Sequence, residues 1–267
     1  MSIVKSTESA SRRDGGVTAL ARGLAILQCF DRPGAQFTVS ELARLVGLSQ
    51  PTTWRLCSTL IDKGFLVKVP GSSALRVGAP ALTLGYAAAQ GQDLRALVRP
   101  YMEQLTTRVG TTVALSLYSG NEMLSIDQTM GSFVVPGQPV GWRASPASSS
   151  AGLAVLAVLP DEDRARALQA IAERDPASWP RRQERIERAA AHFAQHGYIV
   201  LTDMFDGQYA AASVPLVEGG TVPRYWGLSC SGLSTTWTVN ALRPVGEELV
   251  RIRTLLQPAA AVIGALG

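Results

Sequence analysis

The stretch from Thr38 to Gly64 limits the possible folds of this chain most, because it has the pattern of two short amphipathic helices joined by a tight turn. Thr38 and Glu41 have the three-residue spacing of a capping box, which starts the first helix. Gly47 suits the end of that helix, and Ser49 suits the N-cap of the second helix. Two helices joined by a short glycine-containing turn are typical of the helix-turn-helix motif, whose second helix enters the major groove of DNA.

The second helix of this pair has an apolar face and a polar outer face. At about 100° per residue, Arg55 lies nearly opposite the apolar side chains, and hydroxyl-bearing residues lie near it. An ordinary helical hairpin also has a polar outer face, so that interpretation stays open for these residues alone. The expected core face consists of Thr53, Leu56, Cys57, Leu60 and Ile61.

The positive charge of the chain is concentrated in the segment that contains this motif. The net charge of all 267 residues is +4. Residues 1–76 carry ten basic and five acidic side chains, a net charge of +5, whereas the remaining residues have a net charge of −1. Binding to DNA phosphates requires such an excess, so its position favours the helix-turn-helix over a generic solvated basic face.

A predicted β-hairpin follows the second helix. Residues 65–69 and 74–77 are rich in β-prone side chains, with a Pro-Gly-Ser-Ser turn between them. An amphipathic helix over about residues 20–30 precedes the motif, and this order of three helices and a hairpin predicts a winged helix. Lys68 and Arg76 flank the hairpin tip and are candidate phosphate contacts, although solvated hairpin charges are an equal alternative for either one.

The rest of the chain predicts a second, larger domain of the α+β class. A small-residue helix at residues 82–89 links the two parts and suits packing against its copy in a dimer. Beyond it, β-prone runs alternate with amphipathic helices, which predicts an antiparallel sheet with helices packed on it. We expect a disordered tail at residues 1–16, a winged helix-turn-helix domain at 17–78, a linker helix at 79–93 and the second domain at 94–267.

The sequence predicts a cytoplasmic protein. Its apolar runs are shorter than the roughly 18 residues that span a bilayer, and residues 1–16 lack the apolar centre of a signal peptide. Cys29, Cys57 and Cys230 are odd in number and far apart. This pattern fits small core residues in a reducing compartment better than a disulfide framework.

The chemistry of an enzyme is hard to find in this sequence. His192 and His196 have the i,i+4 spacing of metal ligands, but no Glu stands between them and no third ligand is near in the sequence. Ser229 lacks the flanking glycine pair of a nucleophile elbow, and Asp203 and Asp206 have no evident acid–base partner. We therefore expect no catalytic residue, no metal site and no cofactor.

Seven segments, taken in order, carry a resemblance to a known family: ALARGLAILQCF, FTVSELARLVGLSQPTTWRLCSTLIDKGFLVK, RVGAPALTLGYA, LRALVRPYMEQLTTRVGTTVALSLYSGNEMLSID, SSSAGLAVLAVLPDEDR, HGYIV and GLSCSG. With them the chain resembles the IclR-type bacterial transcription regulators over about residues 17–264. The resemblance implies a winged helix-turn-helix, a linker helix and a C-terminal GAF-like effector-binding domain. It also implies a homodimer or a dimer of dimers that binds double-stranded operator DNA and responds to a small metabolite.

The resemblance places the start of the DNA-recognition helix at residues 49–50. Thr52 and Arg55 match the hydroxyl and the outward-facing Arg of the family, and Arg22 matches a position near the DNA backbone. Gln50 and Arg55 have side chains suited to adenine and guanine edges. Gln50 replaces a basic residue of the family and Pro51 replaces a Ser, so a ligand sensor with weakened DNA binding is the alternative function. The expected DNA contacts are Arg22, Thr38, Ser49, Gln50, Thr52, Thr53, Arg55, Lys68 and Arg76.

In the second domain the resemblance implies an effector pocket lined from several separated segments. Ser150 begins a helix whose free amides and hydroxyl suit a small carboxylate, so an organic or aromatic acid is the first candidate effector. Ala147 and Leu153 stand where the family has His and Lys, and Ala210 and Ala211 stand where it has Arg and Cys. These departures predict a less charged and roomier pocket, which favours a larger or more apolar ligand. The expected lining residues are Met130, Phe133, Val135, Ser150, Ala151, Tyr209, Ala211, Ser229 and Ser231.

Overall fold

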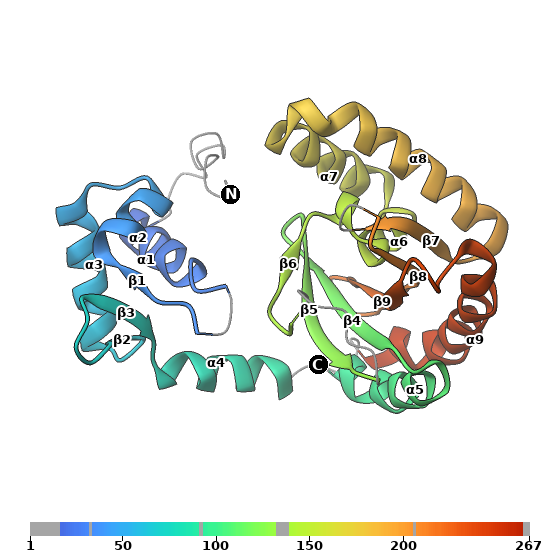
Figure 1. Ribbon diagram of the computed structural model, residues 1–267, viewed down its shortest axis with the longest axis horizontal. Helices are drawn as coiled ribbons and strands as arrows, with labels where there is room; N and C mark the ends of the chain where they lie inside the picture. The colour runs from blue at the N-terminus through green and yellow to red at the C-terminus, as the bar shows by residue number, and fades with distance from the viewer. Residues whose placement is uncertain (1–16, 32–33, 91–92, 132–138, 205–206, 264–267) are drawn as a thin grey trace. The chain divides into compact units, whose positions relative to one another are not determined.

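The computed structural model describes residues 17–31, 34–90, 93–131, 139–204 and 207–263. The chain forms two compact units, Met1–Gly91 and Gln92–Gly267. Figure 1 shows that the first unit is mainly helical with a short sheet, whereas a curved sheet with helices on both faces forms the second. The predicted winged helix-turn-helix and the predicted antiparallel α+β domain are both confirmed.

The first unit combines helices with a short antiparallel sheet. The helices are α1 (Thr18–Gln28), α2 (Val39–Val46), α3 (Gln50–Asp62) and α4 (Ala79–Gln90), and the strands are β1 (Phe37–Thr38), β2 (Leu66–Lys68) and β3 (Ala74–Val77). Strands β2 and β3 form the predicted hairpin, and β1 pairs with the outer edge of β3. The core joins α1, α2, α3 and the hairpin through the buried side chains of Ile26, Leu42, Cys57, Leu66 and Leu75.

The second unit has three layers. Helices α5 (Asp93–Val109) and α9 (Val239–Ile263) cover one face of its sheet, and α6 (Ser150–Leu156), α7 (Asp161–Arg174) and α8 (Trp179–His196) lie on the other (Figure 1). Every pair of neighbouring strands is antiparallel, and the spatial order is β6-β5-β4-β9-β8-β7. The strands are β4 (Thr112–Ser119), β5 (Glu122–Thr129), β6 (Arg143–Ala144), β7 (Ile199–Met204), β8 (Tyr209–Glu218) and β9 (Arg224–Leu233).

Strand β8 shows how the two faces of this sheet differ. Successive side chains of a strand point to opposite faces. Ala210 and Val214 therefore belong to the core under α5 and α9, whereas Ala211 belongs to the core that includes α6. Because helices cover both faces, nearly all side chains of β8 are buried. A small cavity lies on the α6 face.

Some predicted segments differ from the observed ones. Residues 140–142, which look β-prone, form part of a turn, and the short strand β6 follows them. The pocket helix begins at Ser150, as predicted, and ends at Leu156. The predicted β-prone piece at residues 133–135 lies outside the described residues. In the part of the chain that the structure describes, we find no helix with the length and apolar character needed to cross a membrane.

Candidate DNA-binding surface and effector cavity

The start of α2 is fixed by the capping box. The backbone N–H of Thr38 donates to Glu41 Oε2 (2.8 Å), and the backbone N–H of Glu41 donates to Thr38 Oγ1 (3.3 Å). The Thr38 hydroxyl also donates to Glu41 Oε2 (2.8 Å). The backbone N–H of Thr38, and then its hydroxyl, stabilise the carboxylate and hold the pKa of Glu41 below its usual range. Gly47 ends the helix in the left-handed conformation, with φ +67°.

The first turn of α3 is organised differently from the prediction. Ser49 occupies the N-cap position, but its side chain makes no capping hydrogen bond. Its hydroxyl lies 2.9 Å from the hydroxyl of Thr52, and its carbonyl accepts a hydrogen bond from the Thr53 hydroxyl (3.1 Å). The Gln50 side chain reaches back to α2, where Nε2 donates to Ser40 Oγ (2.5 Å). Side-chain hydrogen bonding therefore helps to hold α3 against α2.

The predicted DNA contacts separate into exposed and buried positions. Thr38 and Thr52 are half-buried, and the Thr38 hydroxyl is engaged in the capping box. Thr53 is fully buried and belongs to the core face that the helical periodicity predicts, so its side chain is not available to DNA and we remove it from the proposed surface. The exposed positions are Arg22, Ser49, Gln50, Arg55, Lys68 and Arg76.

The basic side chains of this surface have no acidic partner among the described residues. Among the described residues, every ion pair lies in the second unit, so Arg22, Arg55, Lys68 and Arg76 form none. A cation without an ion pair can bind a phosphate without first losing another partner. Trp54 adds a feature that the list of expected contacts omits, since 47% of its side chain is exposed on α3. Its position directly before Arg55 in the predicted recognition helix is the signal that could have included it.

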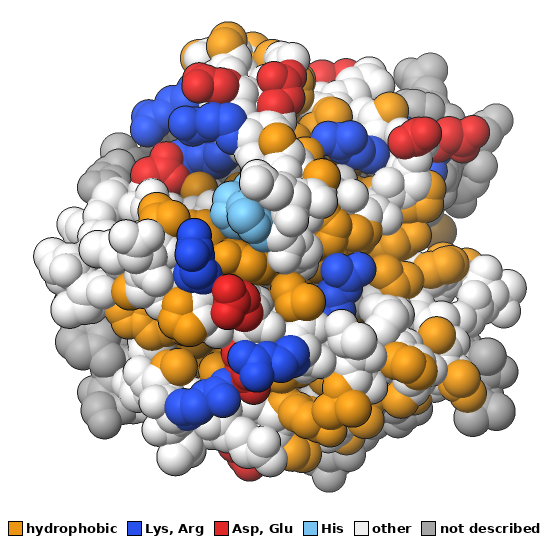
Figure 2. Space-filling view, turned by 90° about the vertical axis from the view of Figure 1, so that its right-hand side faces the viewer, with side chains coloured by type: hydrophobic (Ala, Val, Ile, Leu, Met, Phe, Trp, Pro, Cys, Tyr) orange, Lys and Arg blue, Asp and Glu red, His pale blue; other side chains and the backbone are white. Residues whose placement is uncertain are grey.

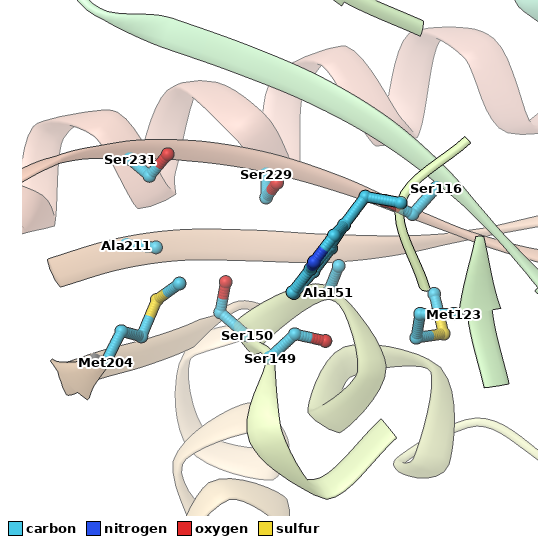
Figure 3. Close-up of a pocket in the computed structure, with 10 residues that line it drawn as sticks. Ser116, Met123, Ser149, Ser150, Ala151, Met204, Ala211, Ser229 and Ser231 are labelled. Carbon is cyan, nitrogen blue, oxygen red and sulfur yellow. The ribbon is translucent and has the colours of Figure 1, made fainter. Parts of the chain in front are cut away.

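A small cavity lies where the start of α6 meets the sheet of the second unit. Figure 3 shows Ser229 and Ser231 on β9 to one side of it, and Ser149 and Ser150 at the start of α6 to the other. Its volume is about 20 Å³, which is roughly the space of one water molecule. The cavity is lined by Ser116, Met123, Trp142, Ser149, Ser150, Ala151, Met204, Ala211, Ser229 and Ser231.

Two glycines allow α6 to lie this close to its neighbours. A Cβ added at Gly227 of β9 would stand 2.7 Å from the Cβ of Ala151, and one added at Gly152 would stand 2.3 Å from the carbonyl oxygen of Pro146. Ser149 caps the helix, because its Oγ accepts a hydrogen bond from the N–H of Gly152 (3.0 Å). The start of α6 is therefore fixed both by a cap and by close backbone packing.

The cavity is polar but uncharged. Ser213 Oγ donates to Ser150 Oγ (2.6 Å), and Ser229 Oγ donates to the carbonyl of Ala114 (3.4 Å). None of the described lining residues is acidic or basic, in line with the expectation of a less charged pocket. The expectation of a roomier pocket finds no support in this cavity, which has a volume of about 20 Å³ and is lined by methionine and tryptophan side chains as well as small residues.

The structure brings together five of the predicted lining residues: Ser150, Ala151, Ala211, Ser229 and Ser231. Met130 does not join them, because it lies beyond the end of β5 with 57% of its side chain exposed. Tyr209 begins β8, two residues from Ala211, and does not line the cavity either. Phe133 and Val135 lie outside the described residues. The lining residues that sequence reasoning missed are Ser116, Met123, Trp142, Ser149 and Met204.

The cysteines pack as free thiols, and the two histidines belong to no metal-binding group within the described residues. Cys29, Cys57 and Cys230 are free thiols, and burial, with a smaller effect of Cys29, raises the pKa of Cys57 to about 11. Thiols that stay protonated near neutral pH act as packing groups rather than nucleophiles. The rings of His192 and His196 lie 4.5 Å apart on α8, and no group of three or more His, Cys, Asp or Glu within the described residues is arranged to hold a metal ion.

Both units match domains of the same protein family. Residues 19–70 match the IclR helix-turn-helix domain, and residues 86–184 match the C-terminal domain of the bacterial transcriptional regulator IclR. The HTH-type transcriptional regulator TsaQ1/TsaQ2 of Comamonas testosteroni is 30% identical over 215 residues, which are 79% of this chain and 77% of that protein.

Solved structures share the whole architecture. The IclR family transcriptional regulator from Brucella abortus has a TM-score of 0.85 and 28% identity, over 94% of this chain and 96% of that one. An IclR homologue from Microbacterium hydrocarbonoxydans, solved in complex with 4-hydroxybenzoate, has a TM-score of 0.70 over 90% of this chain and all of its own. At 23% identity, this second structure adds evidence on the fold alone.

Proposed function

Because this chain belongs to the IclR family of bacterial transcriptional regulators, we propose that it binds operator DNA through its first unit with an affinity controlled by a small molecule bound in its second unit. The relatives are regulators of transcription and not enzymes. The observation that carries the proposal is the outer face of α3, on which Arg55 and Gln50 are exposed next to a capped helix-turn-helix. We place this activity in the cytoplasm, where bacterial operator DNA lies.

The proposed DNA interface divides base reading from phosphate binding. Arg55 suits the O6 and N7 acceptors of guanine, and Gln50 suits adenine, so α3 reads bases in the major groove. Lys68 and Arg76 on the hairpin and Arg22 on α1 are exposed cations free of ion pairs within the described residues, and they suit phosphates on either side. The Gln50 amide is held by Ser40 before DNA arrives, which limits the orientations it adopts.

We further propose that two copies act together through α1. Val17, Leu20 and Leu24 are 67%, 62% and 51% exposed and recur at helical spacing, so they form one apolar stripe. A second copy that covers this stripe also supplies a second recognition helix for a symmetric operator.

Leu20→Glu should convert the assembly to a smaller one in sedimentation velocity. An unchanged sedimentation coefficient contradicts the role of α1 in the dimer.

The effector site is proposed to be the serine-lined cavity under α6. The hydroxyls of Ser149, Ser150, Ser229 and Ser231 offer donors and acceptors, whereas Met123 and the other apolar lining groups suit a hydrocarbon body. A cavity of about 20 Å³ must widen to accept an organic molecule, and flexible methionine side chains permit this. An organic acid, aromatic or short, is the first class to test, since the structural neighbour from Microbacterium hydrocarbonoxydans holds 4-hydroxybenzoate.

The proposed control is thermodynamic linkage between the two units. A ligand that prefers one arrangement of the dimer changes the spacing of the two recognition helices. A coupling free energy of about 1–3 kcal/mol corresponds to a change of about 5–150-fold in operator affinity.

A gel-shift titration tests the proposed function directly. The full chain should bind DNA from upstream of its own gene in the presence of excess unrelated DNA, because base contacts add to phosphate attraction. A complex that unrelated DNA displaces as readily as the upstream fragment contradicts operator recognition. That outcome favours a ligand sensor with weakened DNA binding.

A further inference from the structure

The second unit has a larger hollow than the serine-lined cavity, and it lies between α8 and the edge strand β7. This groove has a volume of about 350 Å³, which falls in the range of small-molecule sites. Arg185, Arg188 and His192 of α8 line it at i, i+3 and i+7 spacing, so they share one face of the helix. Figure 2 faces the side of the molecule that carries α8 and α9, where basic side chains stand among hydrophobic ones and close to a histidine.

The groove carries a positive charge that its own acidic residue does not cancel. Among the described lining residues, the only carboxylate is Asp203, and it is paired with Arg185. Among the described residues, Arg188 pairs only with Glu184, at 4.0 Å, and both of these side chains are about two-thirds exposed. An ion pair of this length and exposure stabilises little, so the Arg188 guanidinium is available to another anion. Arg185 and Arg188 also lie one turn apart, and an anion between them would relieve their repulsion.

The floor of the groove is apolar. Leu153 of α6 and Leu201 of β7 are buried beneath it, and Ala189 of α8 adds a small side chain. A ligand that fits both the cations and this floor has one carboxylate and a hydrocarbon body. An added strand from a peptide fits less well, because charged side chains along an edge strand oppose strand pairing, and Asp203 lies on β7.

We propose that the groove between α8 and β7 is a second small-molecule site, which takes an organic monocarboxylate with an apolar body. The same two elements connect it to the serine-lined cavity. Helix α6 places Ser150 and Ala151 at the cavity and Leu153 at the groove, and β7 places Met204 at the cavity and Leu201 at the groove.

Isothermal titration of the full chain with benzoate at low salt tests this site without using DNA binding. Benzoate should bind, and benzamide, which has the same shape without the charge, should bind at least about tenfold more weakly. Arg188→Gln should weaken benzoate binding by about tenfold, and Arg188→Lys should restore part of the affinity. Asp203→Asn should strengthen it by about threefold, because the groove loses its only negative charge among the described lining residues.

A cavity variant separates the two sites. Ser229→Ala removes a hydroxyl from the serine-lined cavity and lies on a different strand from the groove, so it reports on benzoate bound in the cavity and removes no contact from the groove. Loss of binding in Ser229→Ala with unchanged binding in Arg188→Gln overturns the proposal, since benzoate then occupies the cavity. Equal affinities of benzoate and benzamide also overturn it. So does an absence of benzoate binding up to about 10 mM, because the site is then too weak to act.

Discussion

Ala151 at the start of α6 lies against Gly227 of β9 so closely that the position of a Cβ at residue 227 stands 2.7 Å from the Cβ of Ala151 and 2.8 Å from its carbonyl oxygen. Real Cβ atoms do not approach other heavy atoms this closely, so the contact requires glycine. It also sets the distance between the serines of α6 and those of β9, and with it the size of the cavity between them.

Gly227→Ala should therefore disturb both stability and the cavity. The added methyl group must push α6 away from the sheet, and overpacking of this kind costs about 1–3 kcal/mol. Thermal denaturation should show a lower melting temperature for the second unit. Gly85→Ala in α4 is the control, because the structure shows no atom within 4 Å of the added Cβ. Equal melting temperatures for Gly227→Ala and wild type would contradict the close contact.

Arg55→Ala should weaken operator binding by about 1–3 kcal/mol, or about 5–150-fold, because a bidentate contact to guanine is lost. The side chain is exposed and makes no ion pair among the described residues, so the folded unit should keep its stability. Fluorescence anisotropy of labelled operator DNA gives the affinity. Thr59→Ala, one turn further along α3 and also exposed, is the matched variant and should change affinity by less than about threefold. Undiminished binding by Arg55→Ala would remove α3 from base recognition.

Lys68→Ala and Arg76→Ala should each make DNA binding less dependent on salt. A phosphate contact contributes about −0.9 to the slope of log affinity against log salt concentration, so each variant should lose about that amount. The loss should be similar on operator and unrelated DNA, because phosphates carry no sequence information. Arg251→Ala on α9, whose side chain pairs with Glu248, should keep the wild-type slope. Unchanged slopes for both hairpin variants would show that the hairpin does not touch DNA.

The capping box between Thr38 and Glu41 predicts that the stability of the first unit depends on pH. Hydrogen bonds from Thr38 lower the pKa of Glu41 in the folded state, so their stabilising effect is present above the unfolded pKa and is lost as pH falls through the folded one. Glu41→Gln should be less stable than wild type at neutral pH. The difference in melting temperature should shrink as pH falls below the usual range of a glutamate pKa, because the wild-type side chain then becomes protonated as well. A constant difference across this range would rule out the ionised carboxylate as its source.

Local signals predicted the first unit well. Thr38, Glu41 and Gly47 act on residues at most a few positions away, so the start and end of α2 follow from the sequence. Two predictions disagreed about the side chain of Thr53, one placing it in the core and the other at the DNA. Helical periodicity placed it in the core, the list of expected DNA contacts included it as well, and the structure buries it. Burial of a side chain is fixed by the core of its own unit, whereas a contact inferred from relatives depends on a partner.

The sequence predicted only half of the residues that line the cavity, because the others depend on the register in which the strands pair. Ser229 and Ser231 alternate on one strand, and this period of two is visible in the sequence. Met123 and Ser116 come together at the cavity through the pairing of β4 with β5, which contains a register shift between Leu115 and Ser116. A β-bulge re-aims the side chains beyond it, and no local pattern in the sequence marks its position. Met204 likewise follows a shift in the pairing of β7 with β8.

The most direct test of the account measures linkage in both directions. A small organic acid that raises the melting temperature of the chain is first found by thermal shift. Operator affinity is then measured by anisotropy with and without that acid, and acid affinity by calorimetry with and without operator DNA. We predict a change of about 5–150-fold, equal in the two directions, and a weaker response to the acid in Ser229→Ala. An acid that binds the second unit but leaves operator affinity unchanged would contradict the central claim.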